Sequence, residues 1–321
     1  MNILPPSLGI VLPCFNGEEI LLKTDKKMSQ LIEKMISLNL ISNESIIAYV
    51  DDGSSDKTWE LIQKIIESNK NRLGIKFSRN FGHQAALLGG TSYIYQKVDC
   101  VITIDADLQD DISVIEDMIL QFNHGFEIIY GVRKRRTTDS YFKRTTAKSF
   151  YGLMKIMGAN IIENHADFRL ASRRVCENLF SFGEVNLFLR GIFPLIGFNH
   201  TIVYYDRLER TDGKTKYPLK KMLAFALDGI TSFSVKPLRI VSLLGIFIFI
   251  ICIFLTLYSL ISYFYLGTVP GWTSITLPIY FLGGVQILCI GILGEYLGKI
   301  YQEVKSRPRF IIEKIVLGRD N

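Results

Sequence analysis

The stretch Cys100-Val-Ile-Thr-Ile-Asp-Ala-Asp-Leu-Gln109 places two carboxylates directly after a short apolar run. The run predicts a buried β-strand that ends at Asp105 and Asp107. Neighbouring carboxylates repel each other unless a cation lies between them, and Mg²⁺ prefers carboxylate oxygens together with phosphate oxygens and water. The stretch therefore predicts a cation site at Asp105 and Asp107, with Gln109 adding an amide oxygen. A helix N-cap is the alternative explanation for an Asp at this position.

Strand and helix patterns alternate on both sides of this stretch. Strands are predicted at residues 8–12, 45–50, 74–77, 100–104 and 127–130, and helices at 20–38, 58–68, 84–96 and 112–123. This alternation predicts an α/β fold with a parallel, doubly wound sheet, in which ligands bind beyond the carboxyl ends of the strands. The first strand is not followed by GxGxxG, and the sequence has no GxxxxGK[ST]. The sequence therefore lacks the main motif of a dinucleotide-binding dehydrogenase and that of a P-loop nucleotide-binding protein.

A second acidic pair, Asp51-Asp52, ends the second predicted strand. A carboxylate at this edge can accept the N3–H group of a uracil, and its neighbour can approach the ribose or the cation. Asp-Asp-Gly-Ser is also good turn chemistry, so a simple turn is the alternative.

A third carboxylate, Asp167, lies in His165-Ala-Asp-Phe-Arg169. It is a candidate general base, or a group that orients an acceptor. Basic side chains near Asp167 in the sequence are candidates for holding phosphates. A solvated surface charge is the alternative for each of them taken alone. These side chains are Arg133, Arg144, Lys148 and Arg169.

Residues 240–294 contain no Asp, Glu, Lys or Arg. About 20 apolar helical residues cross a hydrocarbon core of about 30 Å, so this stretch fits two membrane spans. Gly267-Thr-Val-Pro-Gly-Trp272 breaks it, which predicts spans near 240–264 and 275–294. A buried hairpin of a soluble protein is the alternative.

Lys and Arg flank the uncharged stretch on both sides and are absent from its central turn. The positive-inside rule then places both chain ends in the cytoplasm. Residues 220–235 are amphipathic and basic at their start, which predicts a helix on the membrane surface. The N-terminus lacks the features of a signal peptide, and the five scattered cysteines predict reduced thiols.

The expected organisation is a catalytic domain at 1–219, an interfacial helix at 220–236, a transmembrane hairpin at 237–299 and a cytoplasmic tail at 300–321. The expected location is a membrane, with the chain crossing it more than once. No nucleic-acid partner is expected.

Nine segments together resemble family 2 glycosyltransferases of the polyprenyl-phosphate hexosyltransferase type. This group includes bactoprenol glucosyltransferases and dolichol-phosphate mannose synthases, and the former are the more similar. The segments are Val11-Leu-Pro-Cys-Phe-Asn16, Val50-Asp-Asp-Gly-Ser-Ser-Asp56, Ser78-Arg-Asn-Phe-Gly82, Ile104-Asp-Ala-Asp-Leu-Gln109, Tyr130-Gly-Val-Arg133, Ala166-Asp-Phe-Arg169, Ser232-Phe-Ser-Val-Lys-Pro-Leu-Arg239, Pro270-Gly-Trp272 and Gly294-Glu-Tyr-Leu-Gly-Lys-Ile-Tyr301.

The resemblance implies a GT-A type fold that binds a nucleotide-sugar, and it implies a role for each matching residue. Asp167 is the implied catalytic carboxylate, and Mg²⁺ or Mn²⁺ is held by Asp105, Asp107 and Gln109. The nucleotide-sugar site comprises Pro13, Asn16, Glu18, Asp51, Asp52, Asp105, Ala106 and Asp107. The phosphates of donor or acceptor are held by Arg133, Arg144, Arg169, Arg207 and Lys216, of which the last two lie in a donor-covering loop. One departure is Asp110-Asp111, where relatives often have Asp-Pro.

The implied reaction is inverting transfer of a hexose, with glucose as the first candidate, from a UDP-sugar to undecaprenyl phosphate at the cytoplasmic face of the bacterial inner membrane. The product serves modification of O-antigen in lipopolysaccharide, or of another cell-envelope glycan. A homo-oligomer, a flippase and a periplasmic transferase are implied as partners. N-acetylglucosamine, galactose, mannose and aminoarabinose are alternative sugars. A processive synthase is disfavoured because neither tryptophan lies in a QxxRW motif. A non-catalytic scaffold or flippase component is the alternative from another class.

Overall fold

The computed structural model describes residues 4–107, 109–134, 165–184, 189–206 and 271–318, with scattered positions between 238 and 261. The described residues fall into two compact units. Of the described elements, the first unit holds the β-strands and helices α1, α2, α3, α4, α6 and α7, and the second holds α10. Residues 307–318, which follow α10, belong to the first unit.

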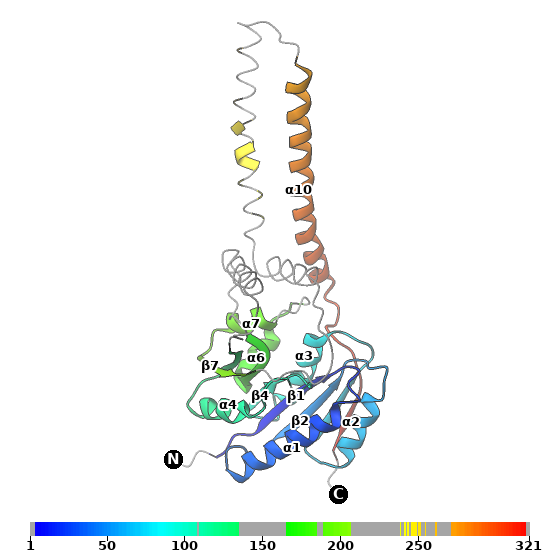
Figure 1. Ribbon diagram of the computed structural model, residues 1–321, viewed down its shortest axis with the longest axis vertical. Helices are drawn as coiled ribbons and strands as arrows, with labels where there is room; N and C mark the ends of the chain where they lie inside the picture. Colours follow the sequence, from blue (N-terminus) through cyan, green and yellow to red (C-terminus); the bar gives the residue numbers. More distant parts are fainter. Residues whose placement is uncertain are drawn as a thin grey trace. The chain divides into compact units, whose positions relative to one another are not determined.

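The first unit alternates strands and helices along most of its length (Figure 1). Its strands are β1 (Leu8–Cys14), β2 (Ile46–Asp51), β3 (Arg72–Phe77), β4 (Cys100–Thr103), β5 (Ile128–Arg133), β6 (His165–Ser172), β7 (His200–Tyr205) and β8 (Ile312–Leu317). Its helices are α1 (Leu21–Ser37), α2 (Thr58–Glu67), α3 (His83–Ile94), α4 (Val114–Asn123), α6 (Arg173–Ser181) and α7 (Leu189–Ile196).

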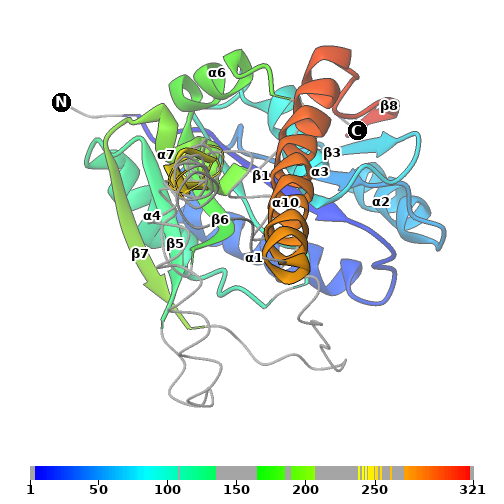
Figure 2. The same ribbon diagram turned by 90° about the horizontal axis from the view of Figure 1, so that it is seen from above.

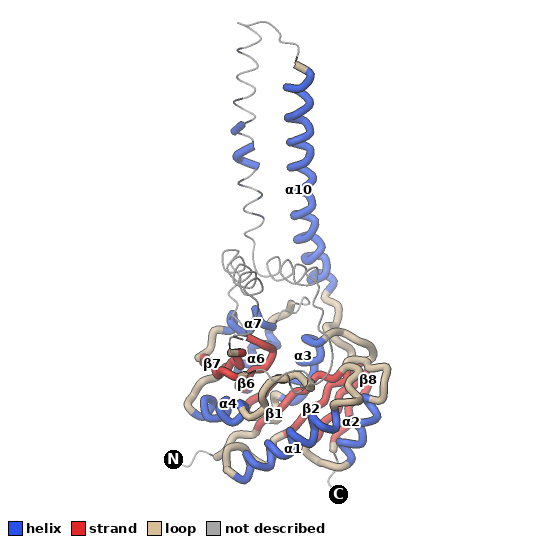
Figure 3. The backbone as a smooth tube through the Cα atoms, in the orientation of Figure 1, coloured by secondary structure: helices blue, strands red, loops and turns tan. Residues whose placement is uncertain are grey.

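The eight strands form one mainly parallel sheet in the order β7-β5-β6-β4-β1-β2-β3-β8 (Figure 3). Strand β6 is antiparallel to its neighbours β4 and β5, and β8 is antiparallel to β3. The other pairs, β1–β2, β1–β4, β2–β3 and β5–β7, are parallel. The carboxyl ends of β1, β2 and β4 therefore share one edge of the sheet, and β6 begins at that edge.

Helices cover both faces of this sheet (Figure 2). The alternation of side chains along β1 explains this arrangement. Leu8, Ile10 and Leu12 join the main apolar core with buried residues of α1, α2 and α4. On the opposite face, Val11 lies against Gly90 of α3. Because successive strand residues point to opposite faces, an uninterrupted apolar strand buried on both sides follows from this sequence pattern.

The second unit contains one long helix, α10 (Trp272–Lys305). Within it, Phe281–Lys305 contains an 18-residue window with a mean hydropathy of 1.5 and no buried residue, and the segment's length and composition suffice to cross a membrane. Among the described residues it is the one such segment. The helix continues past Gly294, the predicted end of the second span. Most of the predicted first span lies outside the described residues, although residues 245–248 within it are helical.

The prediction of an α/β fold with a mainly parallel sheet is confirmed. All five predicted strands and four predicted helices are present, with ends shifted by a few residues. Strands β6, β7 and β8 and helices α6 and α7 were not predicted. Residues 312–317, expected in a tail, pair with β3 as an edge strand. The predicted interfacial helix at 220–236 lies outside the described residues.

Candidate active site

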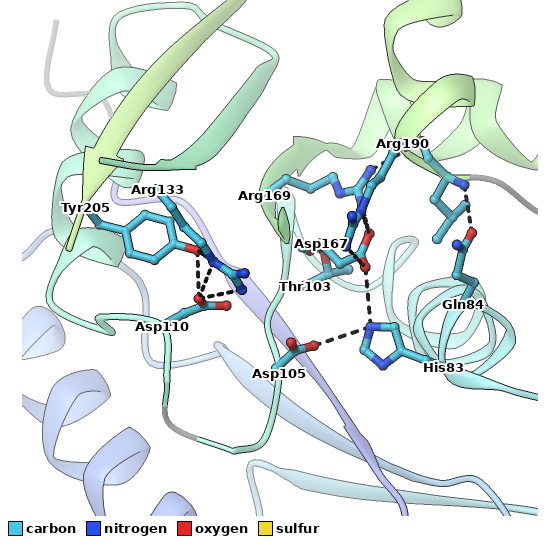
Figure 4. A network of polar contacts seen from close by, with 11 residues as sticks. His83, Gln84, Thr103, Asp105, Asp110, Arg133, Asp167, Arg169, Arg190 and Tyr205 are labelled. Carbon is cyan, nitrogen blue, oxygen red and sulfur yellow. Dashed lines mark hydrogen bonds and ion pairs between the residues drawn. The ribbon is translucent and has the colours of Figure 1, made fainter. Parts of the chain in front are cut away.

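The acidic residues singled out from the sequence gather at one edge of the sheet (Figure 4). Asp51 ends β2, and Asp105 and Asp107 follow β4. Asp167 lies near the start of β6. The antiparallel register pairs Thr103 with Arg169, which places this start beside the carboxyl end of β4. The Thr103 hydroxyl also donates to the Asp167 carbonyl at 2.5 Å. Strand pairing thus fixes the position of Asp167 relative to the end of β4.

Asp167 is buried and carries two guanidinium partners. Arg169 Nη2 lies 2.7 Å from its Oδ1, and Arg190 Nη2 lies 3.0 Å from its Oδ2. Burial alone raises the pKa of Asp167, but contact with His83 and the charges of Arg190 and Arg169 outweigh burial and hold the pKa well below its usual range. A carboxylate with so low a pKa is a weak proton acceptor at neutral pH. The geometry therefore favours an orienting role over that of a general base.

His83, the first residue of α3, lies between two of these carboxylates. Its Nε2 is 3.3 Å from Asp105 Oδ1 and 3.5 Å from Asp167 Oδ2. Burial alone lowers the pKa of His83, but Asp167 and Asp105 outweigh burial and raise it. His83 thus connects the end of β4 with the beginning of β6.

The side chains predicted to hold a cation supply oxygen donors of the required kind. Asp105 Oδ1 is buried and, apart from the His83 ion pair, has no hydrogen-bond partner among the described residues. Burial raises the pKa of Asp105 to about 6. Gln109 donates to Asp107 from its backbone and from its side-chain amide. Among the described residues no group of three or more His, Cys, Asp or Glu side chains is arranged to hold a metal. Two carboxylates nevertheless suffice for Mg²⁺ when phosphate oxygens and water complete the shell.

The loops after β1 and β2 are tied to each other. The Asn16 N–H donates to Ser54 Oγ at 2.9 Å, and Asn16 Oδ1 accepts from the Ser55 N–H at 2.9 Å. Glu18 Oε2 accepts from the Lys57 N–H at 3.0 Å. Asn16 has a φ of 48°, a left-handed conformation that Asn tolerates better than most residues.

The two residues of the Asp51-Asp52 pair have different surroundings. Asp51 is fully buried; its Oδ1 accepts from the Ser54 N–H, and its Oδ2 has no hydrogen-bond partner within the described part of the chain. Burial raises the pKa of Asp51. Asp52 accepts from the backbone N–H groups of Phe81 and Gly82 at 2.7 and 2.9 Å. Asp51 therefore retains an acceptor for a ligand, whereas both oxygens of Asp52 hold the chain just before α3.

A second polar cluster joins Asp110, Arg133 and Tyr205. Asp110 Oδ1 accepts from Arg133 Nη2 at 3.0 Å and from the Tyr205 hydroxyl at 2.7 Å. Arg133 Nε also donates to the Tyr205 hydroxyl at 3.1 Å. Figure 4 shows this cluster across the Asp105 loop from Asp167. It links the chain after β4 to the ends of β5 and β7.

Comparison with known proteins identifies the family. The family described as glycosyl transferase family 2 matches residues 9–180. The chain is 51% identical over 308 residues to YkoT of Bacillus subtilis (strain 168), named an uncharacterized glycosyltransferase, with 96% of this chain and 91% of the relative covered. It is 40% identical over 309 residues to the SfII prophage-derived bactoprenol glucosyl transferase of Shigella flexneri, with 96% and 97% covered.

The chain belongs to glycosyl transferase family 2. This confirms the resemblance drawn from the sequence, and the protein is a glycosyltransferase. Among solved structures, mannosyl-3-phosphoglycerate synthase from Rubrobacter xylanophilus is similar with a TM-score of 0.48 and 15% identity, over 70% of this chain and 71% of that chain.

The predicted site residues of this family 2 glycosyltransferase have varied placements. Asp105 and Asp167 are brought together through His83. The carbonyl of Ala106 accepts from the Thr24 hydroxyl at 2.8 Å, and Pro13 lies near the end of β1. Arg169, a candidate for phosphate binding, is 1% exposed, bonds Asp167 and packs over the Phe193 ring. Arg144, Arg207 and Lys216 lie outside the described residues.

Three residues of the site were missed in the sequence: His83, Gln84 and Arg190. His83 and Gln84 directly follow the matching segment Ser78–Gly82, so two polar residues at the start of a helix were the available signal. Arg190 belongs to α7, in a part of the sequence without regular periodicity. His165 is buried against the Tyr130 ring, and burial and Arg169 lower its pKa to about 2.

Proposed function

We propose that this glycosyltransferase transfers glucose from UDP-glucose to undecaprenyl phosphate, with inversion at the anomeric carbon, at the cytoplasmic face of the bacterial inner membrane. The observation that carries the proposal is the 40% identity, over 96% of the chain, to a relative named bactoprenol glucosyl transferase. That relative's name contains both the lipid and the sugar. The arrangement of charges at the sheet edge is consistent with this reaction.

The donor's uridine would bind at the ends of β1 and β2. Asp51 Oδ2 is a buried acceptor without a hydrogen bond, which suits the N3–H group of a uracil. Pro13, Asn16 and Glu18 line the loop beside it in our proposal. The hydrogen bonds of Asn16 and Glu18 to residues 55 and 57 keep the two loops together around the base.

Asp105, Asp107 and Gln109 would hold Mg²⁺ or Mn²⁺ together with the donor diphosphate. When bound, this cation neutralises charge on the leaving UDP. The raised pKa of Asp105 reflects burial of a carboxylate beside other acidic groups, a setting that a cation relieves.

The acceptor phosphate needs little help to become a nucleophile. The second pKa of a phosphate monoester is about 6, so the group is largely ionised at neutral pH. The protein must instead orient this anion and offset its repulsion from the donor diphosphate. In our proposal Asp167 orients the site and removes no proton. Attack from the face opposite UDP gives inversion.

A lipid acceptor requires a site at the membrane surface, and α10 supports such a location. Strand β8 follows α10 in the chain, yet pairs with β3 of the first unit. If α10 crosses the bilayer, the chain must therefore cross an even number of times to return to the side of the sheet. This reasoning supports the proposed two-span hairpin.

The test is incorporation of label into lipid. Purified protein in detergent is incubated with undecaprenyl phosphate, Mg²⁺ and each of several radiolabelled nucleotide-sugars, with and without EDTA. We expect metal-dependent labelling of the lipid from UDP-glucose. Labelling from another donor would replace glucose by that sugar. Folded protein that labels lipid from no donor would contradict the proposed reaction.

A further inference from the structure

The first turn of α3 and the two residues before it contact Asp52 after β2, Asp105 after β4, Asp167 on β6 and Leu189 of α7. Asp52 at the end of β2 binds the backbone N–H groups of Phe81 and Gly82. Gly82 has a φ of 97°, which a residue with a side chain rarely adopts. These contacts fix where α3 begins, and therefore fix the backbone position of His83.

The side chain of His83 reaches the two carboxylates with different proposed roles. Its Nε2 lies 3.3 Å from Asp105 Oδ1, on the cation side of the site, and 3.5 Å from Asp167 Oδ2, on the acceptor side. One ring nitrogen thus connects both carboxylates (Figure 4).

The next residue secures the other end of the same network. Gln84 Oε1 accepts from the Leu189 N–H at 2.8 Å, at the beginning of α7. Arg169 Nη1 donates to the Leu189 carbonyl at 3.3 Å. Leu189 precedes Arg190, whose guanidinium binds Asp167. Contacts from α3 and β6 therefore fix the position of the Asp167–Arg190 pair.

We propose that His83 is a positioning residue for glycosyl transfer, which holds the cation-binding carboxylate Asp105 and the Asp167–Arg190 pair at a fixed separation. This inference rests on the proposed function. His83 aligns the side of the site that receives the leaving diphosphate with the side that orients the acceptor. Outer partners of metal ligands commonly change metal affinity or activity about 10- to 100-fold when they are replaced.

The test compares His83→Phe, which keeps a ring but removes the nitrogens, with His83→Gln, whose amide can donate from a similar position. His124→Phe is the matched control, because His124 is an exposed residue at the end of α4. Full-length variants are measured for thermal unfolding, for kcat and KM with the donor, and for Mn²⁺ binding in the presence of UDP by electron paramagnetic resonance.

We expect His83→Phe to raise donor KM, because the cation and the donor diphosphate bind together, with little change in unfolding temperature. It should weaken Mn²⁺ binding and lower kcat, each by about 10- to 100-fold. His83→Gln should recover most of both quantities, and His124→Phe should match wild type. Unchanged Mn²⁺ binding and kcat in His83→Phe would overturn the inference. Equal losses of Mn²⁺ binding and kcat in both His83 variants, accompanied by a lower unfolding temperature, would also overturn it. Wild-type protein that binds no Mn²⁺ would overturn it as well.

The binding measurement needs no acceptor, so it separates this inference from the proposed reaction. Wild-type protein that binds Mn²⁺ and UDP but labels no lipid would contradict the proposed reaction. The effect of His83→Phe on Mn²⁺ binding would still decide the role of His83.

Discussion

The environment of Asp167 changes how this residue is expected to act. The sequence shows that Arg169 follows Asp167 by two residues. It does not show that Arg190, 23 positions after Asp167, binds the same carboxylate. Both partners are cations, and one of them is buried. Asp167 is therefore part of a charge network whose loss affects stability as well as turnover.

We expect Asp167→Asn to lower the free energy of unfolding by about 3 to 5 kcal/mol, because it leaves the buried Arg169 guanidinium without a carboxylate. Turnover should fall strongly, while UDP binding should persist. Denaturant titration in detergent and UDP binding measure the two effects. The control is Asp206→Asn, which breaks the exposed Lys134–Asp206 pair and should cost less than about 1 kcal/mol. An Asp167→Asn variant as stable as this control would refute the prediction.

Asp99 provides a pH-dependent contact far from the site. Its Oδ2 accepts from the Ser7 N–H and hydroxyl at 2.9 and 2.8 Å, and Arg173 Nη2 lies 3.2 Å from its Oδ1. Burial alone raises its pKa, but the Ser7 hydrogen bonds and Arg173 outweigh burial and lower the pKa of Asp99. A carboxyl group with a lowered folded pKa stabilises the protein above its unfolded pKa, and this contribution is lost as the pH falls through the folded value.

We therefore expect Asp99→Asn to be less stable than wild type at pH 7. The difference in unfolding midpoint should narrow as the pH is lowered from about 5 toward 2. Thermal unfolding followed by circular dichroism at several pH values measures this, with Asp206→Asn as the control. A difference that widens on acidification would show that the carboxylate of Asp99 is not stabilised in the folded protein.

Among secondary-structure elements, those with a local signal were predictable. Each of the first five strands is a short, mainly apolar and mostly buried run, and helices α1, α2 and α4 each have an apolar face at helical spacing. Helix α3 is instead buried at every position from Ala85 to Thr91. Strand direction has no such signal: β6 runs antiparallel between β4 and β5, and that direction brings Asp167 to the ligand edge. Strand β8 pairs with a partner more than 200 residues away, so its place in the sheet is set by tertiary contacts.

The packing of α3 on the sheet gives a prediction for one element. A Cβ on Gly90 would lie 2.8 Å from Val50 Cγ2, and closer still to Val11 Cγ1. We expect Gly90→Ala to lower stability by about 1 to 3 kcal/mol, because α3 must move away from β1 and β2. Activity should also fall, since α3 begins with His83. Gly183→Ala is the control, because no atom lies within 4 Å of the added carbon. Equal stability of the two variants, measured by urea titration, would contradict this account.

On the scale of the whole molecule, the sheet is built from residues on both sides of α10. Phe310 stacks on Phe77 with ring centroids 5.2 Å apart, and β8 then pairs with β3. The sequence predicted two spans and flanking basic residues, but it did not predict that the segment after the second span completes the catalytic unit. The predicted membrane hairpin and the pairing of β8 with β3 impose the same requirement on the chain: it must leave the side of the membrane that holds the sheet and return to that side.

This requirement predicts the accessibility of three positions. Glu33→Cys lies on the exposed face of α1, and Lys314→Cys lies on β8. Both should react with a membrane-impermeant maleimide in inverted membrane vesicles and be protected in right-side-out vesicles. Thr268→Cys, in the turn between the predicted spans, should show the opposite pattern, and the unmodified chain gives the background of its own cysteines. If Glu33→Cys and Lys314→Cys reacted from opposite sides, β8 could not pair with β3 in the membrane-bound protein. If all three reacted from one side, no span would separate the turn from the sheet, and α10 would not cross the bilayer.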